Sequence, residues 1–186
     1  MKITFEKYEY MLNAVHYTLY LGRVQSIKKQ GRIISKILQC ALRMPFVNRW
    51  NNQLSKRIYH NIKASEENLY NKKTSVSIGM ANHLFGYIYS GYPSLVSLIL
   101  AGTAIRVFHT FDLLIGVLTV GVPICVSYIP AYKAVFSDDR YLQYFKQFEK
   151  EDEAWHKTWK RRTIAFCVGS VFATLSGIAV AFAILF

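Results

Sequence analysis

Three long stretches of this 186-residue sequence contain no charged residue. They cover residues 76–105, 113–130 and 163–186, and the last one also lacks Asn, Gln, His and Pro. As a helix rising about 1.5 Å per residue, residues 163–186 would extend roughly 36 Å, enough to cross a hydrocarbon core of about 30 Å. Apolar stretches of this length are typical of transmembrane helices, so the sequence predicts an integral membrane protein.

The sequence also has little cysteine and no arrangement of it that suggests a bond or a ligand set. Cys40, Cys125 and Cys167 are odd in number, far apart and outside any CxxC pattern. We expect all three to be reduced and bound to no metal. The first thirty residues hold no continuous apolar core, so no secretory signal peptide is expected.

Acidic residues are absent from residues 10–65, where ten Lys and Arg occur, and the whole chain carries a net charge of +12. One interpretation is a set of helices whose basic faces are simply solvated. We favour a basic platform that lies on an anionic membrane surface. Binding of nucleic acid is disfavoured, because no recognised nucleic-acid motif accompanies the charge.

The N-terminal region, residues 1–75, is predicted to be cytoplasmic, basic and built of amphipathic helices. Apolar residues recur at three- and four-residue steps over 3–27, 32–44 and 46–63. Gly22, Gly31 and the pair Lys28-Lys29 indicate a turn between the first two helices, and Pro45 should end the second. Residues 64–75 are polar and predict a linker.

Residues 76–130 are predicted to form a transmembrane hairpin. We expect residues 76–83 in the membrane interface and the first span over 84–105, with a kink at Pro93. Residues 106–111 form a short turn, after which Asp112 or Thr110 caps a second helix over 113–130.

Residues 131–162 predict a cytoplasmic amphipathic helix next to the membrane. Ser137, Asp138 and Asp139 are typical of a helix start, and an aromatic face follows. Nothing in 138–186 breaks a helix strongly, so we expect one long rod that continues into the C-terminal transmembrane helix, 163–186. The basic and aromatic residues before this span resemble a cytoplasmic boundary.

Together these features predict an all-α fold, a polytopic helical membrane protein with three transmembrane helices. Fourteen Lys and Arg precede residue 75 and eight lie in 133–162, but only Arg106 lies in the hairpin turn. Basic residues concentrate on the cytoplasmic side of membranes. We therefore expect a cytoplasmic N-terminus and an outer C-terminus, in a bacterial inner membrane or an organellar inner membrane.

The C-terminal span carries a small residue at every fourth position: Ala165, Gly169, Ala173, Gly177 and Ala181. Such a stripe lets another helix approach closely. We expect it to serve helix packing and the assembly of identical copies.

Three further groups of polar residues are candidates for function. Ser90, Ser94, Ser97, Ser170 and Thr174 could line a pore, although hydrogen bonds between helices are the more ordinary use of such hydroxyls. Arg106, His109 and Asp112 form a polar cluster at the hairpin tip, which could attract ions or simply anchor the turn among headgroups. Contact with anionic lipid is expected from six cations: Arg49, Lys56, Arg57, Lys160, Arg161 and Arg162.

No motif of an enzyme, a cofactor site or a metal site is present, and the five histidines are scattered. We therefore expect a non-enzymatic protein without a cofactor, homo-oligomeric, with a cytoplasmic protein partner conceivable. In layout the hairpin and cytoplasmic helix resemble small bacterial effectors that depolarise membranes, although no motif carries this likeness. The leading hypothesis is a small pore or membrane-perturbing effector controlled through its cytoplasmic helices. The alternatives are an accessory subunit that anchors a larger membrane complex and, more remotely, a membrane-tethered nucleic-acid binder.

Overall fold

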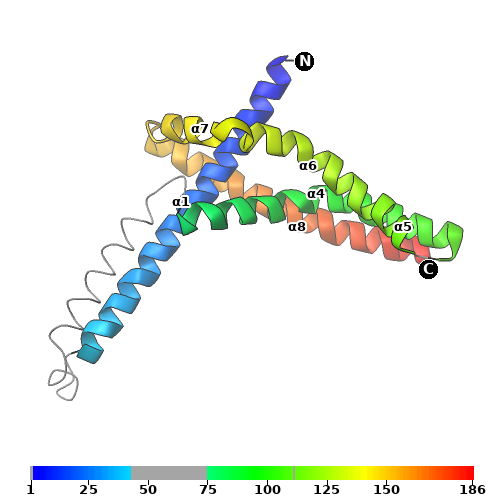
Figure 1. Cartoon of the computed structure of the whole chain (residues 1–186), viewed down its shortest axis with the longest axis horizontal. Helices are drawn as coiled ribbons and strands as arrows, with labels where there is room; N and C mark the ends of the chain where they lie inside the picture. The colour runs from blue at the N-terminus through cyan, green and yellow to red at the C-terminus, as the bar shows by residue number, and fades with distance from the viewer. Residues whose placement is uncertain (1, 43–74, 111) are drawn as a thin grey trace. The chain divides into compact units, whose positions relative to one another are not determined.

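The computed structural model describes residues 2–42, 75–110 and 112–186, with side chains at 5–37, 40, 75–110 and 112–186. Every regular element in these ranges is a helix (Figure 1), as the sequence predicts. The elements are α1 (Lys2–Leu42), α4 (Val76–Phe108), α5 (Leu113–Gly116), η1 (Val117–Gly121), α6 (Val122–Val135), η2 (Ser137–Asp139), α7 (Arg140–Phe148) and α8 (Glu153–Leu185).

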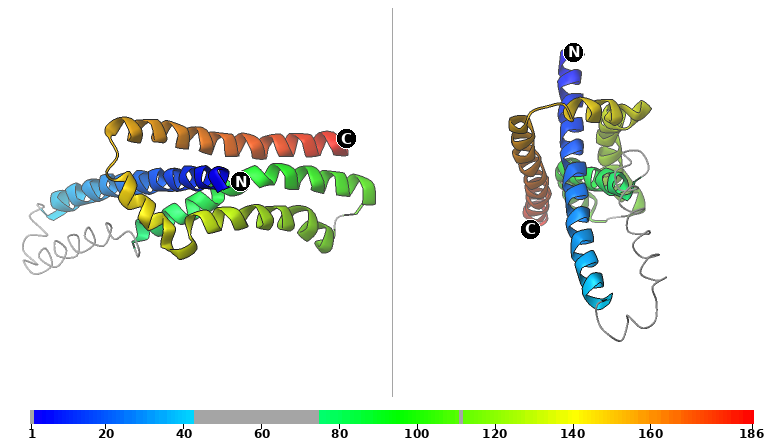
Figure 2. Two further views of the ribbon diagram at one scale, coloured as in Figure 1. Left: turned by 90° about the horizontal axis from the view of Figure 1, so that it is seen from above. Right: turned by 90° about the vertical axis from the view of Figure 1, so that its left-hand side faces the viewer.

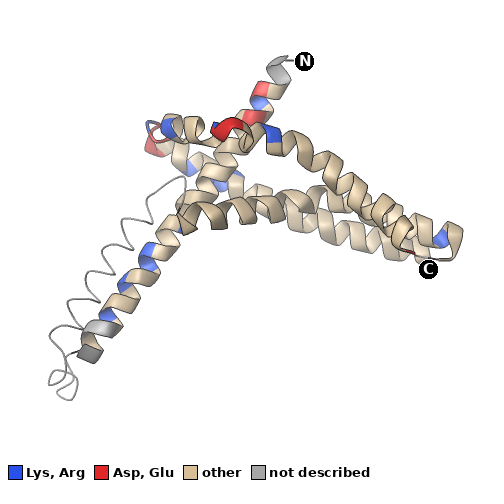
Figure 3. Ribbon diagram, viewed as in Figure 1, with Lys and Arg blue, Asp and Glu red and all other residues tan. Residues whose placement is uncertain are grey.

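Three helical segments are long and apolar enough to cross a membrane: Val76–Phe108, Leu113–Phe148 and Glu153–Leu185. They contain the uncharged stretches 76–105 and 113–130, and all of 163–186 except its last residue. Figure 3 shows long parts of α4, α5, α6 and α8 without a charged residue, apart from Arg106 near the hairpin turn. These helices indicate an integral membrane protein.

Helix α1 runs without interruption where the sequence predicts two helices and a turn. It continues from Lys2 to Leu42 through Gly22, Gly31 and the Lys28-Lys29 pair. A glycine in a helix costs only about 1 kcal/mol relative to alanine, and neither glycine has a positive φ that would end the helix. The predicted turn is therefore wrong. The predicted third helix and the linker lie almost wholly outside the described residues.

Helix α4 is helical from Val76 onward and passes through Pro93. It ends at Phe108, and His109 then adopts a left-handed backbone with φ 52°. Asp112 caps the next helix, because its carboxylate accepts a hydrogen bond from the Ile115 amide at 2.8 Å. Of the two predicted caps, Asp112 is the one the structure uses.

The second helix of the hairpin contains a widened turn. Residues Val117–Gly121 form a π-helix, in which the Val122 amide reaches back to the carbonyl of Val117. Pro123 lies two residues beyond this turn and has no amide hydrogen to donate to the turn before it, which favours such a local rearrangement. Helix α6 then continues past Pro130 to Val135, five residues beyond the predicted end.

The predicted rod over 138–186 is wrong, because the chain turns between α7 and α8. Asp138 and Asp139 have positive φ values of 56° and 53°, and α7 begins only at Arg140. Helix α7 ends at Phe148, and Asp152 caps α8 by accepting a hydrogen bond from the Trp155 amide at 2.7 Å. The turn lets the Phe148 and Trp155 rings stack with centroids 4.8 Å apart, which a continuous helix would prevent.

The chain divides into two compact units, Met1–Leu19 with Asn82–Phe186 and Tyr20–Ala81. In the second unit, the buried apolar side chains include Tyr20 and Val24 on α1 and Ile78 and Ala81 on α4. The candidate sites described below all belong to the first unit.

Within the first unit, α4 lies between α8 and the α5–α6 segment (Figure 2). Hydrogen bonds join α4 to both neighbours. Tyr92 donates to the Phe166 carbonyl on α8 at 2.7 Å, and Tyr89 donates to the Ser127 carbonyl on α6 at 3.0 Å. In the most apolar part of each candidate span few residues are buried: 22% in Val76–Phe108, none in Leu113–Phe148 and 11% in Glu153–Leu185. The spans therefore form an open row, not a closed bundle.

Candidate functional site

The small-residue stripe of α8 lies against α4 of the same chain. A Cβ on Gly177 would come within 3.0 Å of the Leu95 Cα, and one on Gly169 would come within 2.9 Å of the Tyr92 hydroxyl. Ala181 occupies the corresponding place beside Gly102. Ala173 is half-buried, whereas Ala165 is exposed. Use of this stripe by a second copy remains a prediction, and it would require α4 to move away.

The candidate pore-lining hydroxyls all donate hydrogen bonds to backbone carbonyls of their own chain. Ser170 donates to Ile88 across the α4–α8 contact at 2.5 Å, and Ser97 donates to Val120 on the second span at 3.4 Å. The other donors are Ser90 to Tyr87, Ser94 to Gly91, and Thr174 to Ser170 and Gly91. The Ser94 and Thr174 hydroxyls are also 3.0 Å apart.

Four of these hydroxyls line an open groove of about 500 Å³. Its lining includes Ser90, Gly91 and Ser94 of α4, Ser170 and Thr174 of α8, and Ile124 of α6. Because each hydroxyl donates elsewhere but keeps acceptor capacity, the groove can accept hydrogen bonds from water or from another chain. The fifth candidate, Ser97, is buried and does not line the groove.

The hairpin-tip cluster is divided by its hydrogen bonds. The Arg106 guanidinium donates to the Ile184 carbonyl in the last turn of α8, where the partial negative charge of the helix end favours a cation. Asp112 is engaged in capping α5, and His109 is exposed. Arg106 therefore joins the tip to the C-terminal end of α8, and the three residues form no shared site among the described contacts.

The cations expected to contact lipid are exposed wherever they are described. Lys160, Arg161 and Arg162 lie in the part of α8 that precedes the apolar stretch, and the Arg162 guanidinium lies 4.9 Å from the centre of the Trp159 ring. Arg49, Lys56 and Arg57 fall outside the described residues.

The structure assembles an aromatic cluster, of which the sequence reveals only the aromatic face within residues 131–162. Helices α1, α7 and α8, the start of α4 and the end of α6 contribute it. The ring centroids of Tyr10 and Trp159 lie 5.8 Å apart. The Tyr10 hydroxyl accepts a hydrogen bond from the Trp155 indole at 2.9 Å. We call this set the aromatic cap: Tyr10, His16, Tyr17, Phe85, Phe136, Tyr141, Phe145, Phe148, Trp155 and Trp159.

His16 is the polar centre of the aromatic cap. Its side chain is fully buried, four rings (Phe85, Phe136, Tyr141 and Phe145) lie 5.4–5.6 Å from it, and Nε2 is 2.8 Å from the Asn82 side-chain oxygen. Burial lowers the pKa of His16 from 6.5 to about 4, although the hydrogen bond with Asn82 opposes this shift. His16 is therefore neutral at neutral pH. Its partners are distant in the chain, so the sequence does not distinguish His16 from the other histidines.

Asn13 adds a second buried polar group one turn earlier on α1. Its side-chain amide donates to the carbonyls of Glu9 and of Ala134 on α6, both at 2.9 Å. The hydroxyl of Tyr8 lies 2.8 Å from that of Tyr89 on α4, and burial together with this bond raises the pKa of Tyr8. Helix α1 is thus fastened by polar contacts to α4 and α6 beside the aromatic cap.

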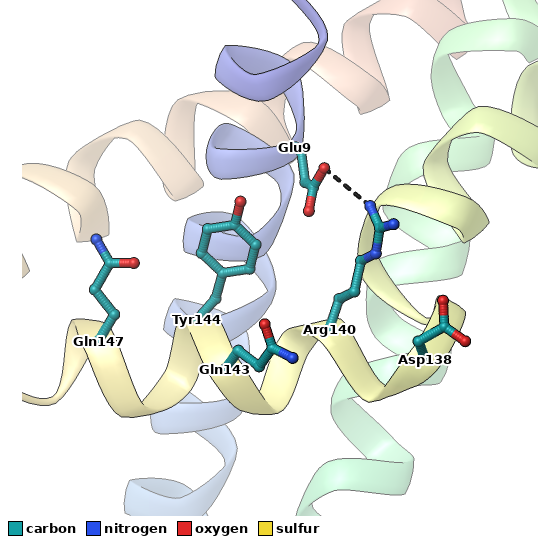
Figure 4. Close-up of a pocket in the computed structure, with 6 residues that line it drawn as sticks. All are labelled: Glu9, Asp138, Arg140, Gln143, Tyr144 and Gln147. Carbon is teal, nitrogen blue, oxygen red and sulfur yellow. Dashed lines mark hydrogen bonds and ion pairs between the residues drawn. The ribbon is translucent and has the colours of Figure 1, made fainter.

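A polar pocket of about 560 Å³ opens between α1 and α7 (Figure 4). Glu9 comes from α1, and the other five side chains come from the η2–α7 segment: Asp138, Arg140, Gln143, Tyr144 and Gln147. Glu9 and Arg140 form an ion pair at 3.2 Å across it. This pocket can hydrogen-bond a small polar molecule through carboxylate, amide and guanidinium groups. The sequence could not reveal it, because Glu9 and Arg140 are 131 positions apart.

Among the described residues no three His, Cys, Asp or Glu side chains are placed to hold a metal ion. Cys40, Cys125 and Cys167 are free thiols in the structure. Comparison of the chain with known protein families, with curated proteins and with solved structures found no match.

Proposed function

We propose that this protein is a non-enzymatic integral membrane protein that assembles as identical copies and alters the permeability of the membrane under the control of its cytoplasmic helices. The observation that carries the proposal is the groove over α4. It opens between α8 and Ile124 of α6, and its hydroxyls retain acceptor capacity. A lipid chain can fill such a groove but cannot donate a hydrogen bond to it. Water or a helix from a second copy can.

Control from the cytoplasmic side is supported by the contacts of α1. This one helix contacts α8 through Tyr10, α6 through Asn13 and α7 through Glu9. Helix α8 continues from the aromatic cap into the apolar stretch without a break, and α6, which is part of the second candidate span, ends at the cap. A partner or a ligand that displaces α1 would therefore move the ends of two spans together.

The test uses the full-length protein in detergent and in liposomes. We expect a multimer by mass photometry and release of a trapped dye from liposomes. Ser90→Leu should fill the groove, reduce the multimer and abolish release. Ser176→Leu is the matched control, because Ser176 is exposed on α8 and does not line the groove. A wild-type protein that stays monomeric and leaves liposomes tight would contradict the proposal.

An accessory subunit that anchors a larger membrane complex is the second candidate. It is favoured by the hydrogen bonds of the five hydroxyls, each of which has an acceptor within its own chain. Such a hairpin is complete without a second copy and presents its apolar faces to lipid or to other subunits. Monomeric protein and tight liposomes are the outcome this candidate predicts.

A further inference from the structure

Another hollow, of about 550 Å³, lies where α1 crosses the beginning of α8. It is lined by three charged side chains and three large apolar or aromatic ones: Glu6, Lys7, Tyr10, Met11, Trp159 and Arg162. The Tyr10–Trp159 ring contact and the Trp155–Tyr10 hydrogen bond hold the two helices together at this point. Trp159 is only 6% exposed, so one wall of the hollow is fixed by packing.

The hollow lies at the boundary of the apolar stretch. Arg162 is the last charged residue before the uncharged run 163–186. In a helix that crosses a membrane, this is the level of the lipid headgroups, where Trp, Lys and Arg side chains concentrate. The position alone brings phospholipid headgroups to the mouth of the hollow.

The charged side chains of the hollow form no ion pair or hydrogen bond with a described residue. Lys7 and Glu6 form no hydrogen bond or ion pair with a described residue, and Arg162 contacts the Trp159 ring through its guanidinium face. The N–H groups of that guanidinium donate to no described residue and can bind a ligand. Two cations and one carboxylate leave the hollow with one net positive charge, which complements one phosphodiester.

We propose that this hollow binds one anionic phospholipid whose headgroup carries hydroxyl groups. The Lys7 ammonium and the Arg162 guanidinium bind the phosphodiester, the guanidinium through two parallel hydrogen bonds. The Glu6 carboxylate accepts a hydrogen bond from a headgroup hydroxyl. Choline offers neither a net negative charge nor a donor, so a phosphatidylcholine headgroup fits this set of groups poorly.

The helix surface below the hollow has room for the acyl chains. Ala165 is three residues beyond Arg162, on the same side of α8, and it is exposed where the later members of the small-residue stripe are covered by α4. A lipid whose phosphate lies beside Arg162 can extend a chain over Ala165. The inference needs only a membrane-embedded α8 and is independent of oligomerisation and of permeability.

Native mass spectrometry of the full-length protein in detergent, titrated with phosphatidylglycerol, tests this site. We expect one tightly bound lipid per protein chain and clearly weaker binding of phosphatidylcholine. The double variant Lys7→Gln/Arg162→Gln should bind phosphatidylglycerol about tenfold more weakly, as expected for the loss of two partly exposed charge contacts. Lys146→Gln/Lys157→Gln is the matched control, because it removes the same charge from exposed positions of α7 and α8 outside the hollow.

These measurements distinguish a lipid site in the hollow from diffuse attraction to the basic surface and from binding of a soluble phosphate. Equal losses in the two double variants would show diffuse attraction to the basic surface and overturn the proposal. Equal binding of phosphatidylglycerol and phosphatidylcholine by the wild type would overturn it as well, whether or not the variants fold. Displacement of the lipid by an equal amount of glycerol phosphate would identify a soluble phosphate as the ligand. We expect no such displacement, because the acyl chains contribute most of the binding.

Discussion

At the scale of single residues, His16 is the most unusual group in the described chain. A fully buried imidazole is held by one hydrogen bond and four rings, and its Nδ1 atom has no partner among the described atoms. A charged imidazolium would have to lose its water in this place, so the neutral form is strongly favoured. The aromatic cap is therefore built around a base that stays unprotonated until the pH is low.

We predict that acidification destabilises the folded protein through His16. The pKa of His16 is about 4 when folded and 6.5 when unfolded, so between these values only the unfolded chain binds the proton. Stability is complete above about pH 6.5 and falls as the pH drops toward 4, by about 3 kcal/mol in all. Thermal unfolding of the protein in detergent, followed across this range, measures the loss.

His16→Gln should remove most of this pH dependence, because the amide does not titrate. The matched control is His109→Gln, which alters an exposed histidine and should keep the wild-type slope. If wild type and His16→Gln lost stability equally with falling pH, the buried imidazole would not be the cause.

At the scale of elements, the contact between α4 and α8 depends on glycine. A Cβ at Gly91 would lie 2.9 Å from the Ser170 carbonyl oxygen, and one at Gly177 would lie 3.0 Å from the Leu95 Cα. Because backbone atoms occupy both places, a larger residue cannot be accommodated by a change of rotamer. The close approach also brings the hydroxyls of α8 to the carbonyls of α4 near Pro93, where the proline leaves the helix one amide donor short.

We predict that Gly177→Leu separates α8 from α4. The test introduces Ser94→Cys and Thr174→Cys, whose wild-type hydroxyls are 3.0 Å apart, into a protein without its native cysteines. Oxidation should join the pair efficiently in the parent and several-fold less in the Gly177→Leu variant.

Gly121→Leu is the control, since a Cβ there meets only a Val117 methyl at 3.9 Å. It should leave crosslinking unchanged. Efficient crosslinking in the Gly177→Leu variant would mean that the two helices do not depend on this contact.

At the scale of the whole molecule, charge is segregated from the apolar helices. Arg106 is the only Lys or Arg between residues 75 and 132, and none follows Arg162. Three crossings by the candidate spans would place the beginning of α4 and the end of α8 on opposite sides of a membrane. The excess of basic residues favours the cytoplasm for the N-terminal side.

We predict that position 109 is outside the cell and position 150 inside. His109→Cys and Lys150→Cys both place a thiol at an exposed site, in the hairpin turn and between α7 and α8 respectively. A membrane-impermeant thiol reagent added to intact cells should label only the first. The second should react only after the membrane is permeabilised. Labelling of position 150 alone in intact cells would contradict the orientation.

The segments that can span a membrane were determined by the sequence alone. The thirty residues 76–105 and the residues 163–186 carry no charge. Helices of this length and apolar composition are hydrated poorly by water, so composition suffices to identify them. Asp112 was also recognisable as one of two possible caps, because capping depends on residues three positions apart. Local and compositional signals of this kind need no knowledge of the fold.

The tertiary structure decided what the polar and small residues contact. Gly177 meets Leu95, Ser170 meets Ile88, and His16 meets Asn82, all across long separations in the chain that periodicity does not report. The apolar character of a segment depends only on its own residues, whereas these contacts exist only once the helices are packed together.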